Sequence, residues 1–171
     1  MKIFISLLSL LLCGNNYGHE TQNNNRIIVS LNFSELTQPN MSSNKKREES
    51  TKTKYTMVTY VDKNDCPLCF VCHLQEWEIF MKYCNVENIP LNFVFIFHPE
   101  CSNEPLFTDK LHSTSISKIS YIDTHGTFRE KNPWLNHSDL GKIFIIAEKK
   151  APIFVDAPPY GHKFLSWLHD L

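Results

Sequence analysis

Three cysteines, Cys66, Cys69 and Cys72, stand close together in the middle of the sequence. A Cys-x-x-Cys pair at the start of a helix has a defined chemistry, because unpaired N–H groups and the helix dipole favour a thiolate there. Such a thiolate attacks a disulfide, and the second thiol then resolves the mixed disulfide. Pro67 suits the first helical position, where a missing N–H costs nothing. The cluster therefore predicts dithiol exchange at a helix start.

The cluster contains two overlapping pairs, and the sequence does not choose between them. In one pair Cys66 attacks and Cys69 resolves; in the other Cys69 attacks and Cys72 resolves. The short turn between the preceding apolar run and Cys66 favours the first pair. Because Cys69 belongs to both pairs, all three cysteines are candidate catalytic residues.

The same residues fit three other interpretations. Cys69, Cys72 and His73 have the spacing of a c-type haem attachment motif, although c-type cytochromes are mostly helical and this segment lies between two apolar runs. The thiols of Cys66, Cys69 and Cys72 with His73 are also soft ligands for zinc or copper, but thiols on one helix diverge by about 100° per residue. The third alternative is a disulfide with no catalytic role, which only stabilises the start of the helix. We therefore predict neither a cofactor nor a metal ion.

Apolar and β-branched runs predict the elements that position the cluster. The predicted strands are Tyr55–Val61, Leu91–Phe97, 120–123 and a hairpin of 142–147 with 152–155, and the predicted helices follow residue 66 and span 105–113 and 161–171. Alternation of strands and helices predicts an α/β fold, with a central mixed sheet covered by helices on both faces. We expect Cys84 on the apolar side of the first helix, and Cys101 either exposed in a loop or paired with a cluster cysteine.

The first 18 residues resemble a signal peptide. Lys2 is followed by an apolar run from Ile3 to Leu12, which at about ten residues is too short to cross a ~30 Å hydrocarbon core. Cys13 stands where a lipoprotein signal would end, so acylation there would provide a membrane tether; an ordinary cleaved signal is the alternative. Residues 19–53 are predicted as a linker with an extra strand at 27–33, and residues 54–171 as the domain.

Composition narrows the function further. The chain has 171 residues, a formal net charge of −1 and only 5 Gly, so nothing indicates nucleic acid or an anionic surface as partner. An exported chain meets an environment that permits disulfides. Without Cys13 the number of cysteines is odd, so at least one thiol stays unpaired or joins a partner.

Residues 55–171 resemble the thioredoxin superfamily, most closely the periplasmic thiol–disulfide oxidoreductases and the thioredoxin-like lipoproteins common in Bacteroidetes. The likeness comprises a strand leading to Cys-x-x-Cys, a second apolar strand, a short strand ending in Asp and a closing hairpin, at 57–61, 93–96, 121–123, 144–146 and 153–155. In those lipoproteins the motif is followed by a basic residue, an apolar residue and Gln, and then an aromatic residue. Residues 72–77 are similar, which favours Cys69 with Cys72.

This resemblance implies a thioredoxin-like fold in a periplasmic or membrane-anchored protein that exchanges thiols and disulfides with envelope proteins. The alternative is a catalytically idle lipoprotein module that binds an envelope partner. Two positions depart from the family pattern. No proline stands just before Phe144, where the family usually has one facing the cysteines. Asp65 replaces the usual aromatic residue before the first cysteine, and its charge is expected to raise the pKa of Cys66.

Overall fold

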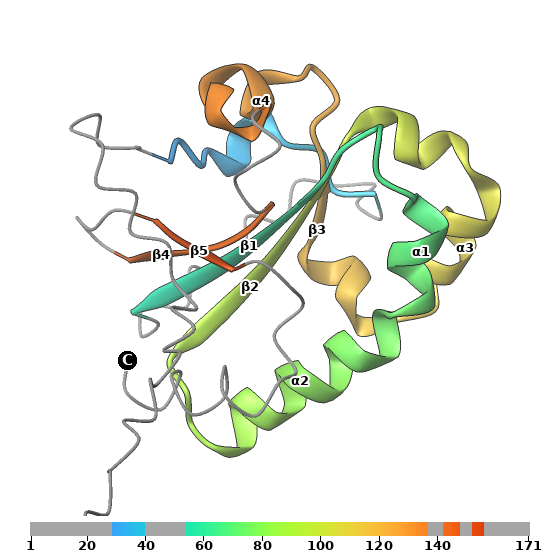
Figure 1. The fold of residues 1–171 in the computed structure, drawn as a ribbon. Coiled ribbons are helices and arrows are strands. Elements are labelled where there is room, and N and C mark those ends of the chain that lie inside the picture. Colours follow the sequence, from blue (N-terminus) through green and yellow to red (C-terminus); the bar gives the residue numbers. More distant parts are fainter. Residues whose placement is uncertain (1–28, 40–53, 137–141, 148–151, 156–171) are drawn as a thin grey trace, which may run out of the picture.

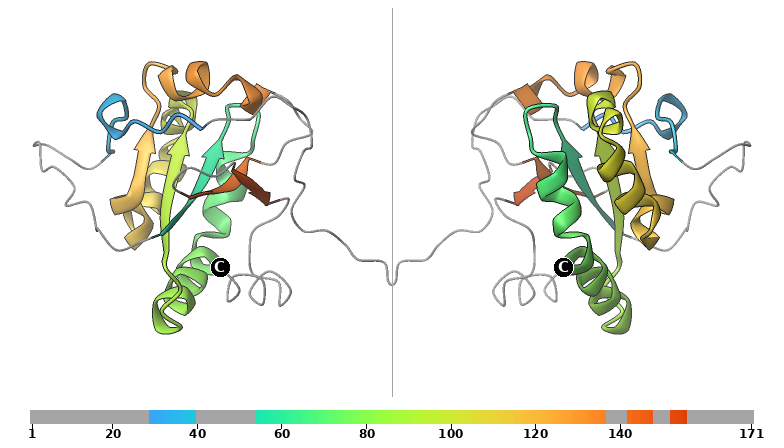
Figure 2. Two further views of the ribbon diagram at one scale, coloured as in Figure 1. Left: turned by 90° about the vertical axis from the view of Figure 1, so that its left-hand side faces the viewer. Right: turned by 90° about the vertical axis from the view of Figure 1, so that its right-hand side faces the viewer.

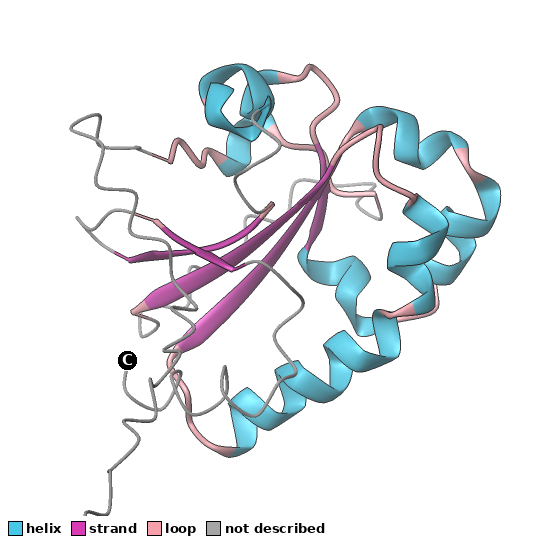
Figure 3. Cartoon of the chain, viewed as in Figure 1, coloured by secondary structure: helices cyan, strands magenta, loops and turns pink. Residues whose placement is uncertain are grey.

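The computed structural model describes residues 29–39, 54–136, 142–147 and 152–155, which form an α/β fold around a mixed sheet (Figure 1). Its strands are β1 (Tyr55–Val61), β2 (Leu91–Phe97), β3 (Ser120–Ile122), β4 (Ile143–Ala147) and β5 (Ile153–Val155). Its helices are α1 (Pro67–Cys72), α2 (Leu74–Val86), α3 (Pro105–His112) and α4 (Thr127–Lys131). Four short 3-10 turns join them: η1 (Phe33–Glu35), η2 (Pro99–Asn103), η3 (Ser115–Ile119) and η4 (Pro133–Asn136). Figure 3 shows how helices and strands alternate along the chain.

The strand that leads to the cysteines occupies the centre of the sheet. The strand order is β3-β2-β1-β4-β5. β1 pairs with β2 in parallel along its full length and with β4 antiparallel, while β4 and β5 form an antiparallel hairpin. β3 extends the sheet in parallel beside β2. The predicted strands and hairpin are therefore confirmed.

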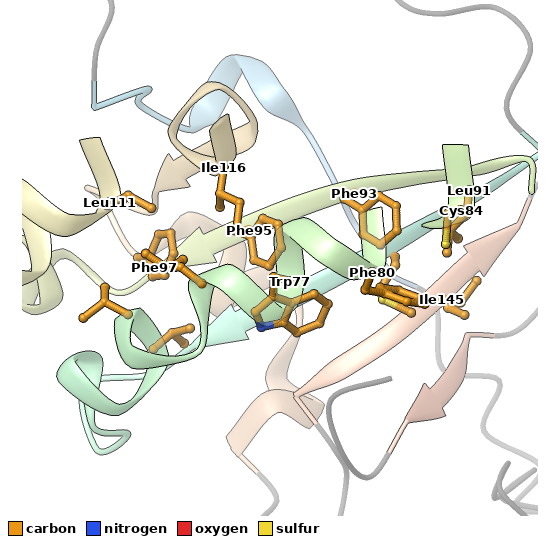
Figure 4. Close-up of a cluster of buried hydrophobic side chains, with 14 of the residues drawn as sticks. Trp77, Phe80, Cys84, Leu91, Phe93, Phe95, Phe97, Leu111, Ile116 and Ile145 are labelled. Atoms are coloured by element: carbon orange, nitrogen blue, oxygen red, sulfur yellow. The ribbon is translucent and has the colours of Figure 1, made fainter. Parts of the chain in front are cut away.

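The alternating side chains of β1 and β2 divide the core into two layers, because successive residues of a strand point to opposite faces. On one face Phe93, Phe95 and Phe97 pack against α1, α2 and α3. Trp77 of α2 meets Phe95 edge-on at 5.1 Å between ring centroids, and both side chains are labelled in Figure 4. On the other face Tyr60 packs with residues of α4 and η4. Helices lie on both sides of the sheet in Figure 2, as predicted.

The prediction of a strand at 27–33 is wrong for its described residues, 29–33. The backbone N–H and C=O of Ser30 both bond to the side chain of Asn132, at 2.9 Å each, so they are not available to a neighbouring strand. Asn32 then caps η1 with its side chain, which turns the chain away from an extended path. The segment reaches the sheet only at Thr37, which forms a single antiparallel bridge with Ile122.

Several predictions lie outside the described residues: the signal peptide, acylation of Cys13, most of the linker at 19–53, and the closing helix at 161–171. In the part of the chain that the structure describes, no helix is long and apolar enough to cross a membrane.

Candidate functional site

A tight turn carries the chain from the end of β1 to the cysteines. The N–H of Asp65 donates to the carbonyl oxygen of Asp62 at 3.0 Å, and the N–H of Asp62 donates to the carboxylate of Asp65 at 2.7 Å. These reciprocal bonds close the turn at 62–65. Cys66 follows directly, so the first thiol lies at the carboxyl end of the central strand.

Cys66 caps the first turn of α1. Its backbone is extended, with φ −82° and ψ 103°, and its Sγ accepts the N–H of Cys69 at 3.1 Å. Pro67 takes the first helical position, as predicted. Hydrogen bonds from the thiol and backbone of Cys69 lower the pKa of Cys66, because both stabilise the thiolate. Cys66 is thus the thiol that this arrangement activates.

The pKa of Cys69 is shifted in the opposite direction from that of Cys66. Its pKa is raised, first because its thiol donates a hydrogen bond to Cys66 and then because burial and the neighbouring thiols disfavour a second negative charge. Cys66 is therefore the more readily ionised of the two thiols. This division fits Cys66 as the attacking thiol and Cys69 as the resolving thiol, so the geometry favours the first of the two predicted pairs.

Cys72 is the last residue of α1, and the helix breaks immediately after it. His73 leaves helical geometry, with φ −102° and ψ 7°, and α2 begins at Leu74. Cys66, Cys69 and Cys72 are all exposed and unpaired. The structure therefore brings the three predicted residues together on one solvent-facing side of a single short helix.

The opposite side of α1 anchors it to the sheet. Val71 is buried, and Leu68 and Phe70 pack against the core. The ring of Phe70 meets those of Phe95 and Phe97 edge-on, with centroids 5.7 and 5.3 Å away. A separation of three residues thus places the thiols on one face of α1 and apolar side chains on the other.

Asp65 does not have the predicted effect on Cys66. Its carboxylate accepts the Asp62 N–H, and its second oxygen lies 2.7 Å from the Nζ of Lys142. The pKa of Cys66 is lowered, not raised, because hydrogen bonds from Cys69 determine it. Lys142 stands just before β4, where the family resemblance leads one to expect a proline. Sequence reasoning gave Lys142 no role, since only the pairing of β4 with β1 places it beside Asp65.

The two remaining described cysteines are buried. Cys84 lies in the core, as predicted, where burial raises its pKa to about 12. Cys101 is also buried, and its pKa is raised to about 11, mainly by loss of solvation. The prediction that Cys101 is exposed or paired is therefore wrong. Its Sγ lies 3.8 Å from the carbonyl oxygen of Val61, beneath the end of β1.

The residues that suggested haem or metal do not converge where the structure describes them. The ring of His73 turns to Glu76, with Nδ1 3.0 Å from a carboxylate oxygen. Among the described residues, no three His, Cys, Asp or Glu side chains are grouped so that they could hold a metal ion.

Comparison with known proteins found no match to a family model, a curated protein or a solved structure. The interpretation of the site therefore depends on its own geometry. The site contains an exposed pair of thiols, one with a lowered and one with a raised pKa, and a third exposed thiol beside them. The other two described thiols are buried elsewhere.

Proposed function

We propose that this chain performs thiol–disulfide exchange with protein substrates through Cys66 and Cys69. The observation that carries the proposal is the hydrogen bond from the Cys69 N–H to Cys66 Sγ at 3.1 Å, in a thiol pair open to solvent. Reactive cysteines are exposed and have a lowered pKa, whereas structural cysteines are buried and inert. Cys66 belongs to the first kind, and Cys84 and Cys101 to the second.

A purely structural role explains the thiol face of α1 poorly. Its cysteines pack against nothing in the core, and Cys is a weak helix former, so neither packing nor propensity favours three cysteines there. Exposed unpaired thiols are also prone to oxidation, which makes them a liability unless they have a use. Chemistry at these positions accounts for their presence.

The fold we propose is thioredoxin-like. The order of elements supports it: a central strand leads to the Cys-x-x-Cys helix, a second parallel strand and a helix follow, and a hairpin pairs with the central strand on its other side. These are the features on which the resemblance in the sequence was based. Lys142 in place of the expected proline marks a difference in how a substrate backbone would be received.

In the proposed reaction the Cys66 thiolate attacks one sulfur of a substrate disulfide. A bond forms between Cys66 Sγ and that sulfur, the substrate S–S bond breaks, and the second substrate sulfur leaves as a thiolate. Cys69 then gives its proton to solvent or to that thiolate and attacks Cys66 Sγ. The Cys66–Cys69 bond forms, the bond between Cys66 and the substrate breaks, and the first substrate sulfur leaves as a thiolate. The substrate is reduced to two thiols and the chain is oxidised to a Cys66–Cys69 disulfide. The reverse sequence oxidises a substrate.

We also propose that this exchange takes place in the cell envelope, after export. The apolar run at residues 3–12 supports export, and the envelope permits the disulfides that such a reaction needs. The partners would be envelope proteins with thiols or disulfides. Acylation of Cys13 would hold the chain at the membrane.

Single substitutions test the proposal directly. Cys66→Ser and Cys69→Ser are each expected to abolish insulin reduction in the presence of dithiothreitol. Cys84→Ala removes a buried thiol as a control and is expected to leave the rate unchanged. A wild-type chain without activity in both reduction and oxidation assays would contradict the proposal and favour the idle binding module.

The pH dependence of alkylation is a second test. The pKa of Cys66 is lowered from 9.0, so its reaction with iodoacetamide is expected to rise through a midpoint below pH 9.0. The pKa of Cys69 is raised from 9.0 by its neighbours, so Cys69 of the same unsubstituted chain, followed by peptide mass spectrometry, is expected to react only above that pH. Equal midpoints for the two thiols would contradict the division of roles.

A further inference from the structure

Cys72 has no part in the exchange described above, although it shares the exposed face of α1 with the reactive pair. It is the third residue after Cys69, as Cys69 is the third after Cys66. Its negative charge, when ionised, acts on Cys69 strongly enough to contribute to the raised pKa of that thiol. Because residues three apart lie on the same face of a helix, Cys69 and Cys72 are neighbours on that face of α1.

Helix geometry determines which thiols can be joined. With a rise of 1.5 Å and 100° per residue, Cα atoms three apart in an ideal helix are separated by about 5 Å, and those six apart by about 10 Å. Disulfides need Cα atoms roughly 4.4–6.8 Å apart. Cys69 can therefore bond to Cys66 or to Cys72, whereas Cys66 and Cys72 are too far apart to bond to each other. Cys69 is the shared member of two alternative disulfides.

We propose that Cys72 is a third catalytic thiol, which transfers the disulfide along α1 from Cys66–Cys69 to Cys69–Cys72. This inference rests on the proposed thiol–disulfide exchange and extends it. In the step, the Cys72 thiolate attacks Cys69 Sγ, a Cys69–Cys72 bond forms, the Cys66–Cys69 bond breaks, and Cys66 leaves as a thiolate. One S–S bond replaces another, so no external oxidant or reductant is consumed.

Two features of the site favour this step. Thiols of lower pKa leave faster in disulfide exchange, and Cys66 is the thiol whose thiolate the site stabilises. Cys72 is also the last residue of α1, and regular helix ends at His73, with ψ 7°. Adjustment at Cys72 therefore does not require bending the middle of a long helix.

The consequence is a chain that is oxidised and still nucleophilic. When the disulfide joins Cys69 and Cys72, Cys66 is again a free thiolate that can attack a second disulfide. The mixed disulfide formed at Cys66 then has no ready resolving thiol in the chain, so a thiol of the substrate must resolve it. That outcome is disulfide isomerisation, and it identifies proteins with several cysteines as the substrate class.

Label location in the oxidised protein tests the transfer. The full chain with Cys13→Ser is equilibrated in a glutathione redox buffer, quenched with acid, labelled with N-ethylmaleimide and digested with trypsin. Cleavage after Lys63 and Lys82 places all three thiols in one peptide, free of other cysteines. Peptides with one internal disulfide are expected to carry the label on Cys66 in one population and on Cys72 in another. Label on Cys72 alone would overturn the proposal.

Three variants in the same background separate this inference from the proposed function. Cys72→Ser retains only the first pair and Cys66→Ser only the second, and both are expected to form an internal disulfide. The matched control, Cys69→Ser, retains two thiols that are too far apart and is expected to form none. A disulfide in Cys72→Ser but not in Cys66→Ser would overturn the proposed role of Cys72 as a third catalytic thiol and leave the proposed function intact. No disulfide in either variant would overturn both.

Discussion

Replacing Phe70 with Ala is expected to loosen the helix that carries the thiols. Phe70 is the aromatic residue of α1 that packs on the core, through edge-on contacts with Phe95 and Phe97 at 5.7 and 5.3 Å. Each aromatic pair contributes about 1 kcal/mol beyond burial. Because the side chain is half-buried, the lost burial adds roughly 1–2 kcal/mol. The free energy of unfolding is expected to fall by about 3 kcal/mol, in the range for large core truncations.

Urea denaturation under reducing conditions measures this loss. Trp77 and Trp134 are both buried, so their fluorescence reports unfolding from opposite faces of the sheet. With a slope near 2 kcal/mol per molar urea, the midpoint of Phe70→Ala is expected to fall by about 1.5 M. Phe70→Leu keeps most of the apolar area but no ring, so about half of the shift is expected.

Ile79→Ala is the matched control on the neighbouring helix. Ile79 is 62% exposed, and its truncation is expected to cost less than about 0.5 kcal/mol. Loosening α1 also weakens the bond from the Cys69 N–H to Cys66, so Phe70→Ala is expected to slow alkylation of Cys66 at pH 7, whereas Ile79→Ala leaves it unchanged. Equal urea midpoints for Phe70→Ala and Ile79→Ala would refute the argument that Phe70 anchors α1.

Three further predictions concern the surroundings of the site. Burial raises the pKa of Cys101 to about 11, so at pH 7 its thiolate fraction is about a hundredth of that of an ordinary thiol with a pKa of 9.0. Alkylation of Cys101 in the native protein, followed by mass spectrometry, is expected to be slower by at least that factor. Rapid labelling would contradict the prediction. Asp123 accepts hydrogen bonds from the N–H groups of Phe128 and Arg129 at 3.0 and 3.1 Å. In urea denaturation, Asp123→Ala is expected to lower the free energy of unfolding by about 3 kcal/mol, and Asp123→Asn by about half as much. An unchanged midpoint would show that these bonds contribute nothing to stability. Lys142→Met removes the cation beside Asp65, so the pKa of Cys66 is expected to rise and its alkylation at pH 7 to slow. Lys142→Arg is the control, because it keeps the positive charge. Equal alkylation rates in the two variants would contradict an effect of the Lys142 charge on Cys66.

Local patterns in the sequence were sufficient to predict most of the elements. The β-branched and aromatic runs at Tyr55–Val61 and Leu91–Phe97 match β1 and β2 residue for residue. Pro67 after a polar turn correctly marked the start of a helix at the cysteines. These predictions hold because strand periodicity and the missing N–H of proline act within a few residues, without distant partners.

The failed predictions concern residues whose partners are far away along the chain. Ser30 bonds to Asn132, which is 102 residues later, and this contact replaces the strand predicted there. Cys101 follows an apolar strand in a loop-like segment, and only the packing of η2 beneath the end of β1 shows that it is buried. No periodicity within the segment itself signals such contacts.

The cysteine cluster shows what the sequence and what the tertiary structure each contribute. The types and spacing of its residues predicted dithiol chemistry at a helix start, but they allowed two pairs with Cys69 in common. The folded backbone favours the pair of Cys66 and Cys69, because the extended geometry of Cys66 directs its sulfur at the Cys69 N–H, while Cys72 is at the end of the helix. The proton affinity of a thiol depends on which donors surround it in space, and spacing in a sequence does not specify those donors.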